Sequence, residues 1–191
     1  MANSDLRWYI LVVNYEQGFA LRDLLLKHDI KNRIAPAPRS IQGELSCGMS
    51  LLIEDEDIEA ALYALERCGI HYHLTAIPGL GGKEMSQEHA IKTAALISRH
   101  RPLSIWCIML KIWPNTPLAQ MVEDGIFEPM TPEEILQEEL EMVSRITLPG
   151  PTLYVDSTVL QKYSIVAMLP EQKDSMLQQM QMLLNTESQL S

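Results

Sequence analysis

The chain has only three cysteines, and none of them forms a close pair in the sequence. Cys47, Cys68 and Cys107 are widely spaced, and neither a CxxC nor a CxxxCxxC motif is present. Zinc sites and iron–sulfur clusters need closely grouped thiolate ligands, so we expect neither a metal site nor a cluster from this chain alone. Three unpaired cysteines also favour a reducing compartment over an oxidising one.

Targeting signals and basic residues are scarce as well. The N-terminus lacks the charged-then-apolar pattern of a signal peptide, and no apolar run reaches about 18 residues. Lys and Arg number 15 against 25 Asp and Glu, which gives a net charge of -10. Nucleic acids and anionic membranes attract proteins through Lys and Arg, so we expect neither as a partner. These features predict a cytoplasmic protein.

What is present indicates a globular α/β chain. Of the 191 residues, 47% are hydrophobic and 21% are charged, enough to build one well-buried domain or two small ones. Apolar residues recur at helical spacing from Leu21 to His28 and from Ile58 to Leu65. Short apolar runs predict strands at residues 8–13, 32–35, 49–53 and 71–77. The order β-α-β-β-α-β is that of a ferredoxin-like unit, which we assign to residues 1–77.

A second alternation of strands and helices fills residues 78–191. Ser86 predicts the start of a helix. The residues expected on the buried side of that helix are Ala90, Ile91, Ala94 and Ile97. Residues 103–112 are nearly all apolar, as in a strand that is buried on both faces.

The end of the chain continues the same alternation. Thr116-Pro117 predicts the start of a short helix that ends at Gly125. Thr131-Pro132-Glu133-Glu134 is a capping box with proline at the first helical position. A strand at residues 152–155 and a helix from Pro170 follow. The expected result is a partial β/α unit, corresponding to half of a barrel.

The two predicted domains meet at a glycine-rich stretch, Ile77-Pro78-Gly79-Leu80-Gly81-Gly82-Lys83-Glu84. A glycine turn between a strand and a helix lets the backbone approach a ligand and points helix N–H groups outward, which suits an anion or a nucleotide. Glu84 stands where a P-loop has Ser or Thr, and no third glycine falls at the spacing of the dinucleotide fingerprint. A tight connection that binds nothing is the simpler interpretation.

The first domain also carries a short motif around its central loop. Pro36-Ala37-Pro38-Arg39 is followed by Ser46-Cys47-Gly48 and then by an apolar strand. Through these residues, the chain up to about Ile77 resembles a family of small bacterial domains of unknown function that are described as selenium/sulfur carrier-like. The resemblance implies that a cysteine thiol carries a sulfur or selenium atom.

A second set of motifs runs from the glycine stretch to Lys173. After the glycine stretch come, in order, Glu88-His89-Ala90, Trp113-Pro114-Asn115-Thr116-Pro117-Leu118, Gly125-Ile126-Phe127-Glu128-Pro129-Met130-Thr131-Pro132-Glu133-Glu134 and Leu169-Pro170-Glu171-Gln172-Lys173. This part looks like the C-terminal half of the barrel of a radical S-adenosylmethionine (SAM) enzyme. The resemblance implies that Gly79, Gly81, Gly82 and Glu84 lie against SAM.

The chain departs from the radical SAM pattern in two places. The cluster-binding CxxxCxxC of that family belongs to the first half of the barrel, which this sequence lacks. Asp156-Ser157-Thr158-Val159-Leu160-Gln161 stands where the family usually has a polar run rich in Asn, His and Ser. Without a cluster no electron is available to cleave SAM, so we do not expect radical catalysis by this chain alone.

Cys47 is the strongest candidate for chemistry. It lies in a glycine-flanked loop outside any apolar run, and an accessible thiolate is a nucleophile. Arg39 would favour the thiolate if the loop folds back, Glu44 would oppose it, and Gly48 leaves the thiol uncrowded. Cys68 and Cys107 fall within apolar patterns, so we expect both to be buried. His71 and His73 share one face of a strand, but they need no metal to explain them.

Three functions remain open on this evidence. The first is a sulfur or selenium carrier, or an accessory protein, that acts through Cys47. The second is a SAM-binding component of a radical SAM enzyme whose partner supplies the iron–sulfur half. The third is a structural remnant without chemistry. Half a barrel leaves strand edges unpaired, so the sequence also predicts self-association or a protein partner.

Overall fold

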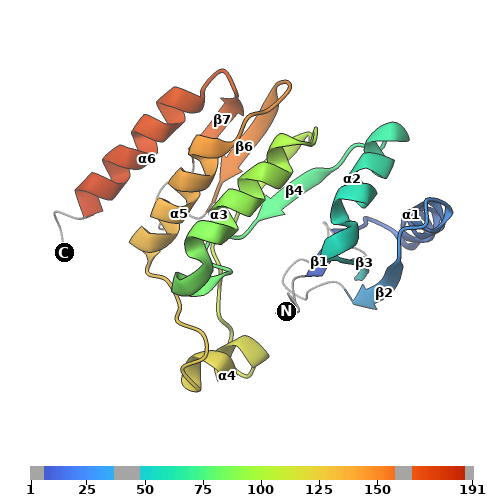
Figure 1. The fold of residues 1–191 in the computed structure, drawn as a ribbon, viewed down its shortest axis with the longest axis horizontal. Coiled ribbons are helices and arrows are strands. Elements are labelled where there is room, and N and C mark those ends of the chain that lie inside the picture. Colours follow the sequence, from blue (N-terminus) through green and yellow to red (C-terminus); the bar gives the residue numbers. More distant parts are fainter. Residues whose placement is uncertain (1–6, 37–47, 158–164, 188–191) are drawn as a thin grey trace. The chain divides into compact units, whose positions relative to one another are not determined.

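A computed structural model describes residues 7–36, 48–157 and 165–187. The chain folds into two compact units, Met1–Ile70 and His71–Ser191, shown as a ribbon in Figure 1. Each unit has its own sheet and its own hydrophobic core. Within the described ranges, no helix combines the length and the apolar character that crossing a membrane requires.

The first unit contains a three-stranded antiparallel sheet in the order β1-β3-β2. Its elements are β1 (Arg7–Leu11), α1 (Tyr15–Lys27), β2 (Asn32–Pro36), β3 (Met49–Glu54), the 3-10 turn η2 (Asp55–Asp57) and α2 (Ile58–Arg67). Because β3 lies between β1 and β2, the β1-α1-β2 segment is a split βαβ unit, as in ferredoxin-like folds. The predicted strands and helices up to residue 67 are therefore confirmed.

Local chemistry fixes the helix ends of this unit. The Asn14 side chain accepts a hydrogen bond of 2.8 Å from the Gln17 backbone N–H and begins α1. Gly69, at φ +67°, lets the Ile70 N–H bond to the Leu65 carbonyl at 2.9 Å and ends α2. Both helices pack on the same side of β3. The buried core consists of Val12, Leu25, Ile30, Met49, Leu51, Ile53, Ala61 and Ala64.

The prediction that residues 71–77 close the first sheet is wrong. The strand forms as β4 (His73–Ala76), but it pairs in parallel with β5 (Ser104–Cys107) in the second unit. Leu74 and Ala76 contribute to the core of that unit. An apolar strand pattern does not identify its partner strand, so the sequence located β4 correctly and assigned it to the wrong sheet.

The second unit has a four-stranded sheet in the order β4-β5-β6-β7. Its other elements are α3 (Gly82–Ser98), α4 (Pro117–Glu123), α5 (Pro132–Arg145), β6 (Thr152–Asp156), β7 (Ile165–Leu169) and α6 (Lys173–Glu187). β4, β5 and β6 are parallel, whereas β7 runs antiparallel to β6. The sequence interpretation missed β7, which ends the parallel series expected of a barrel segment.

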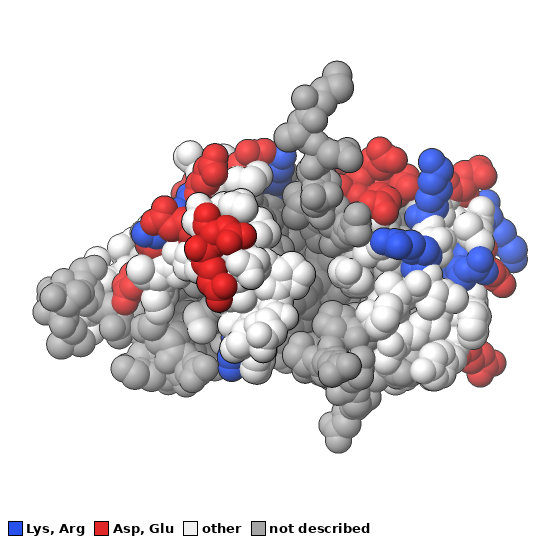
Figure 2. Space-filling model, turned by 90° about the horizontal axis from the view of Figure 1, so that it is seen from below, with Lys and Arg blue, Asp and Glu red and all other residues white. Residues whose placement is uncertain are grey.

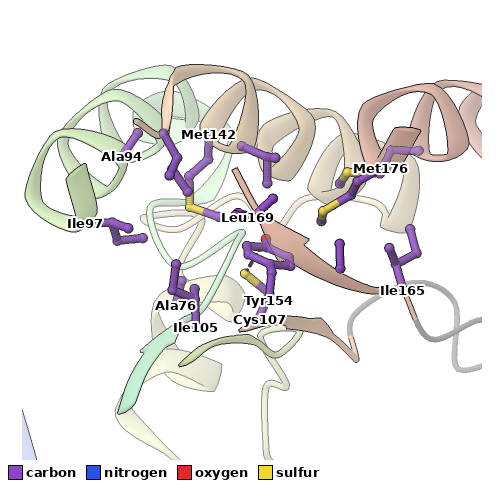
Figure 3. Packing of buried hydrophobic residues seen from close by; sticks show 14 of the residues in the cluster. Ala76, Ala94, Ile97, Ile105, Cys107, Met142, Tyr154, Ile165, Leu169 and Met176 are labelled. Carbon is purple, nitrogen blue, oxygen red and sulfur yellow. Dashed lines mark hydrogen bonds between the residues drawn. The ribbon is translucent and has the colours of Figure 1, made fainter. Parts of the chain in front are cut away.

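Three long helices cover one face of this sheet. α3, α5 and α6 lie side by side over the strands, and α4 lies apart from them (Figure 1). Inward residues of the strands, such as Ile105, Tyr154 and Leu169, meet helix residues such as Met142 and Met176 (Figure 3). These side chains form the larger of the two cores, and their burial is the main stabilising term for this unit.

Two sequence predictions in this unit are corrected. Ser86 does not begin a helix: α3 starts four residues earlier, with Gly81 as its N-cap, because the glycine turn itself leads into the helix. Ile91, expected on the buried side, is 39% exposed. The apolar run at residues 103–112 forms a strand only over β5. Trp106 on that strand is 43% exposed, so β5 is buried on one face rather than two.

The helix caps predicted at Thr116 and Thr131 are confirmed. The Thr131 side chain accepts a bond from the Glu134 N–H, and the Glu134 carboxylate accepts one of 2.7 Å from the Thr131 N–H. This reciprocal pair begins α5, with Pro132 at its first turn. The Thr116 side chain accepts a bond of 3.2 Å from the Ala119 N–H and caps α4, and Gly125 at φ +68° follows the end of that helix.

Candidate functional site

The central loop of the first unit is held at both ends by the sheet. β2 ends at Pro36, which is opposite Met49 at the start of β3, so the intervening loop closes between paired strands. The Ser50 hydroxyl donates to the Ala35 carbonyl at 3.1 Å and reinforces this closure. Two of the predicted site residues, Arg39 and Cys47, lie outside the described residues.

Gly48, the third predicted residue of this site, marks the point where the loop returns to the sheet. Its φ is +88°, a conformation that favours glycine, and a Cβ atom added there would meet nothing within 4 Å. The next residue, Met49, is anchored: a Cβ on Gly18 of α1 would lie 2.7 Å from Met49 Cε. The residue that follows Cys47 is thus uncrowded, and the one after it is fixed in the core.

The other two cysteines differ from each other. Cys107 is fully buried, as predicted. The prediction that Cys68 is buried is wrong, because this thiol is exposed. Cys68 is the C-cap of α2, where the chain turns away through Gly69, so the buried stripe of the helix ends at Leu65. The spacing of apolar residues could not show where the helix stops.

The glycine stretch packs tightly against its own chain. Gly79 has φ +85°, and a Cβ there would lie 3.1 Å from Ile135 Cγ1. At Gly82, with φ +61°, a Cβ would lie 2.9 Å from the Glu128 carbonyl oxygen and 3.1 Å from the Phe127 ring. Gly81 lies against the backbone of Met85. Gly82 is therefore packed closely against the loop before α5, and Gly79 against α5 itself, whether or not a ligand also approaches them.

Hydrogen bonds and ion pairs fix the start of α3 to the same loop. The Lys83 N–H donates to the Glu128 carbonyl at 3.0 Å. The Lys83 ammonium lies 3.1 Å from Glu128 Oε1 and 3.3 Å from Glu134 Oε1. These two carboxylates raise the pKa of Lys83. Glu84, predicted to contact SAM, is exposed.

A buried carboxylate supports the glycine stretch from below. Glu138 on α5 accepts a hydrogen bond of 3.0 Å from the Gly79 N–H at Oε1, and His89 Nδ1 on α3 lies 2.8 Å from the same oxygen. The side chain of Glu138 is only 1% exposed, and its buried Oε2 atom has no hydrogen-bond partner among the described residues. Glu138 thus joins the turn, α3 and α5.

A second buried polar group lies at the carboxyl ends of the parallel strands. Cys107 Sγ is 2.8 Å from the Tyr154 hydroxyl, which donates to Glu139 Oε1 at 2.7 Å. Figure 3 shows Cys107 beside Tyr154 beneath the helices. Burial and the nearby Glu139 and Asp156 raise the pKa of the Cys107 thiol well above its ordinary value. Burial is also the main cause that raises the pKa of Tyr154.

No sequence pattern indicated that Tyr154, Glu138 and Glu139 form buried hydrogen bonds. The only signal for them was an acidic pair on a helix whose neighbours are apolar, Ile135, Leu136 and Val143. Such a pair is usually solvent-exposed, because burying a carboxylate is costly unless it is hydrogen-bonded. Burial raises the pKa of the Cys107 thiol, and a neutral thiol is a poor nucleophile.

His73 begins β4, and His71 lies two residues before that strand. His73 Nδ1 lies 2.6 Å from Ser104 Oγ, within the sheet. Among residues 7–36, 48–157 and 165–187, no three His, Cys, Asp or Glu side chains are grouped so that they could hold a metal ion.

Comparison with known families bears on the first unit. Residues 7–74 match the model of the family described as "Putative Se/S carrier protein-like". Over these residues the chain is similar to that family. A comparison of the chain with curated proteins gives no match. The matched residues lie in the N-terminal part for which the resemblance was predicted. They include the loop with Arg39, Cys47 and Gly48.

Proposed function

We propose that the first unit is a sulfur or selenium carrier and that Cys47 is the carrier residue. The observation that carries this proposal is the family match over residues 7–74, which spans the central loop. Two further features support it. The loop is anchored by the β2–β3 pair, and reactive groups commonly lie on loops that a rigid scaffold positions. At Gly48, the residue after Cys47, an added Cβ atom would meet no described atom within 4 Å.

The proposed chemistry is thiol–persulfide exchange. The Cys47 thiolate attacks the terminal sulfur of a donor persulfide, the donor's S–S bond breaks, and the donor leaves as a thiolate. Cys47 then holds the persulfide, and an acceptor nucleophile removes its outer sulfur and regenerates the Cys47 thiolate. No net oxidation occurs. A selenium atom would be carried by the same exchange. Arg39 would favour the thiolate, which is the reactive form, if the loop folds back on Cys47, and Glu44 would oppose it.

Persulfide loading of the purified full chain tests this proposal. The protein is incubated with a small-molecule persulfide donor, and each cysteine is then analysed by peptide mass spectrometry for one added sulfur atom. We expect loading at Cys47 and loss of loading in Cys47→Ser. Cys68→Ser is the matched control, because Cys68 is the other thiol of this unit and is exposed. Equal loading of Cys47 and Cys68 would show only general thiol reactivity and would contradict the proposal.

A second candidate function concerns the glycine stretch. We propose that Gly79, Gly81, Gly82 and Glu84 form part of a SAM-binding edge that needs a partner to supply the iron–sulfur half. The supporting observation is that this stretch follows β4 at the carboxyl ends of the parallel strands β4, β5 and β6, where open α/β sheets commonly bind ligands. The close packing of Gly79 and Gly82 against Ile135 and Glu128 leaves little room beside them.

Calorimetric titration with SAM distinguishes the two candidates. Binding that is weakened by Glu84→Gln but not by Cys47→Ser would support the SAM-binding component. Absence of binding at millimolar SAM would leave the glycine stretch as a structural connection. The carrier proposal does not depend on the outcome.

A further inference from the structure

A small pocket lies on the first unit, between the end of α1 and one flank of α2. Its volume is about 240 Å³, the space of roughly eight water molecules. All of its lining residues belong to the first unit and to the part of the chain that the structure describes. They are His28, Ile30, Ala60, Tyr63, Ala64 and Arg67.

Local structure on both sides creates this hollow. α1 ends in a turn in which Asp29 adopts φ +60° and the Ile30 N–H bonds to the Leu25 carbonyl at 3.0 Å. The turn buries Ile30, which forms the apolar floor of the pocket together with Ala64. Ala60 and Ala64 lie on one flank of α2 at i and i+4, and their methyl groups are too short to fill the space. The pocket is therefore set by the fold of the unit.

The rim of the pocket offers donors and a positive charge. Arg67 and His28 supply nitrogen atoms, and the half-exposed ring of Tyr63 supplies an aromatic wall. No Asp or Glu is among the lining residues. Within the described part of the chain, no group forms a hydrogen bond or an ion pair with the Arg67 guanidinium. A guanidinium without a protein partner, placed beside an apolar hollow, is available to an anionic ligand.

The surroundings favour an anion more than the net charge of -10 suggests. Lys27 and Lys31 outnumber Asp29 around the turn, and Lys and Arg side chains gather over the first unit on the side of the molecule shown in Figure 2. Carbonyl groups at helix ends repel anions, but here N–H groups occupy them. The Leu25 carbonyl accepts the Ile30 N–H, and the corresponding bond at the end of α2 joins residues 65 and 70.

We propose that this pocket binds a small carboxylate with an apolar body, such as an aromatic acid. The Arg67 guanidinium binds the carboxylate through two parallel N–H···O bonds, a geometry for which arginine is suited. The apolar body lies on Ile30 and Ala64 beside the Tyr63 ring. An inorganic anion would use the rim and leave this floor uncovered. The volume is below the roughly 300–1,000 Å³ of pockets for drug-sized molecules, so the ligand is small.

Titration of the full chain with sodium benzoate, followed by two-dimensional amide NMR of the isotope-labelled protein, tests the proposal. We expect saturable shifts confined to the backbone amides of residues 28–30 and 60–67, with a Kd of about 1 mM. Acetate has the charge without the apolar body, and benzamide has the body without the charge. Each should bind at least about tenfold more weakly than benzoate, because each uses only half of the pocket. Equal binding of either one overturns the proposal.

Substitutions at surface positions separate the charge from the hollow. Arg67→Gln removes the guanidinium and should weaken benzoate binding about tenfold or more. Ala60→Leu fills the pocket and should abolish binding, and because Ala60 is exposed the core stays intact. Arg22→Gln is the matched control, since it removes the same charge from α1 outside the pocket, where Arg22 pairs with Asp23.

The carrier function of Cys47 is independent of this pocket, so persulfide loading should be the same with and without benzoate. Absence of benzoate binding at about 10 mM overturns the proposal. So does an Arg67→Gln protein that binds as tightly as the wild type, because the guanidinium would then take no part. Weaker binding in Arg67→Gln with unchanged binding in Arg22→Gln supports it.

Discussion

Glu138 holds a turn that lies 59 residues earlier in the sequence: its Oε1 atom accepts a hydrogen bond of 3.0 Å from the Gly79 backbone N–H. The same oxygen bonds to His89, so one buried carboxylate connects the glycine stretch with α3 and α5. The position of the glycine stretch therefore depends on Glu138, which lies outside the stretch and its motif.

Replacing Glu138 should destabilise the second unit. In Glu138→Ala, the Gly79 N–H and His89 Nδ1 both lose their buried acceptor, which costs about 1–3 kcal/mol for each group left unsatisfied. Urea unfolding measures the loss in the free energy of unfolding. Glu141→Ala on the same helix removes an ion pair with Arg145 at the surface and should change it by less than about 0.5 kcal/mol. Equal effects of the two changes would contradict a structural role for the Glu138 bond.

Alanine substitutions at two glycines with left-handed backbone conformations distinguish the cost of a steric contact from the cost of backbone strain. Gly82→Ala forces a Cβ to within 2.9 Å of the Glu128 carbonyl oxygen, in addition to the strain of φ +61°. Gly125→Ala meets only the strain, because nothing lies within 4 Å of its Cβ position. We expect a loss of about 1–2 kcal/mol for Gly125→Ala and a clearly larger one for Gly82→Ala, measured by urea unfolding. A smaller loss at Gly82 would show that the packing there is loose.

The buried thiol and phenol make the fold sensitive to alkaline pH. The pKa values of Cys107 and Tyr154 are raised in the folded state above ordinary values of 9.0 and 10.0. Well below pH 9 both groups hold their protons in the folded and in the unfolded state, so their full contribution to the free energy of unfolding is present. Above about pH 9 the unfolded chain releases protons that the folded chain retains. The free energy of unfolding should then fall by up to about 1.4 kcal/mol per pH unit for each group.

Denaturant unfolding from about pH 8 to 11 measures this slope, starting from the ordinary cysteine range. Cys107→Ala should flatten the first part of the slope, near pH 9, and leave the part due to Tyr154 in place. Cys68→Ala is the control, since Cys68 is exposed. An unchanged slope in Cys107→Ala would show that the thiol is not the group that titrates.

The capping box of α5 can be tested by a single change. Thr131→Ala removes the acceptor of the Glu134 N–H and should cost about 1 kcal/mol. Because the Thr131 backbone N–H lowers the pKa of Glu134, the box is complete only where Glu134 is ionised. Protonating Glu134 at acid pH should therefore reduce the difference between the wild type and Thr131→Ala. Ser144→Ala, near the exposed end of the same helix, should have little effect.

Short-range patterns in the sequence determined most of the elements. The apolar spacing of α2, the Gly69 turn and the Thr131 capping box are local, because their partners lie within a few residues. The loop with Cys47 was recognised from its glycine and proline residues and from a short motif that the family match covers. Local chemistry suffices wherever an element begins or ends through contacts with its own neighbours.

Tertiary structure decided everything that depends on distant partners. The sequence predicted a strand at residues 71–77, but only the pairing of β4 with β5 placed it in the second sheet. The bonds from Glu138 to Gly79 and from Tyr154 to Glu139 join residues that are far apart in the sequence or on different elements. Partner choice and burial result from long-range packing, which a single sequence pattern does not encode.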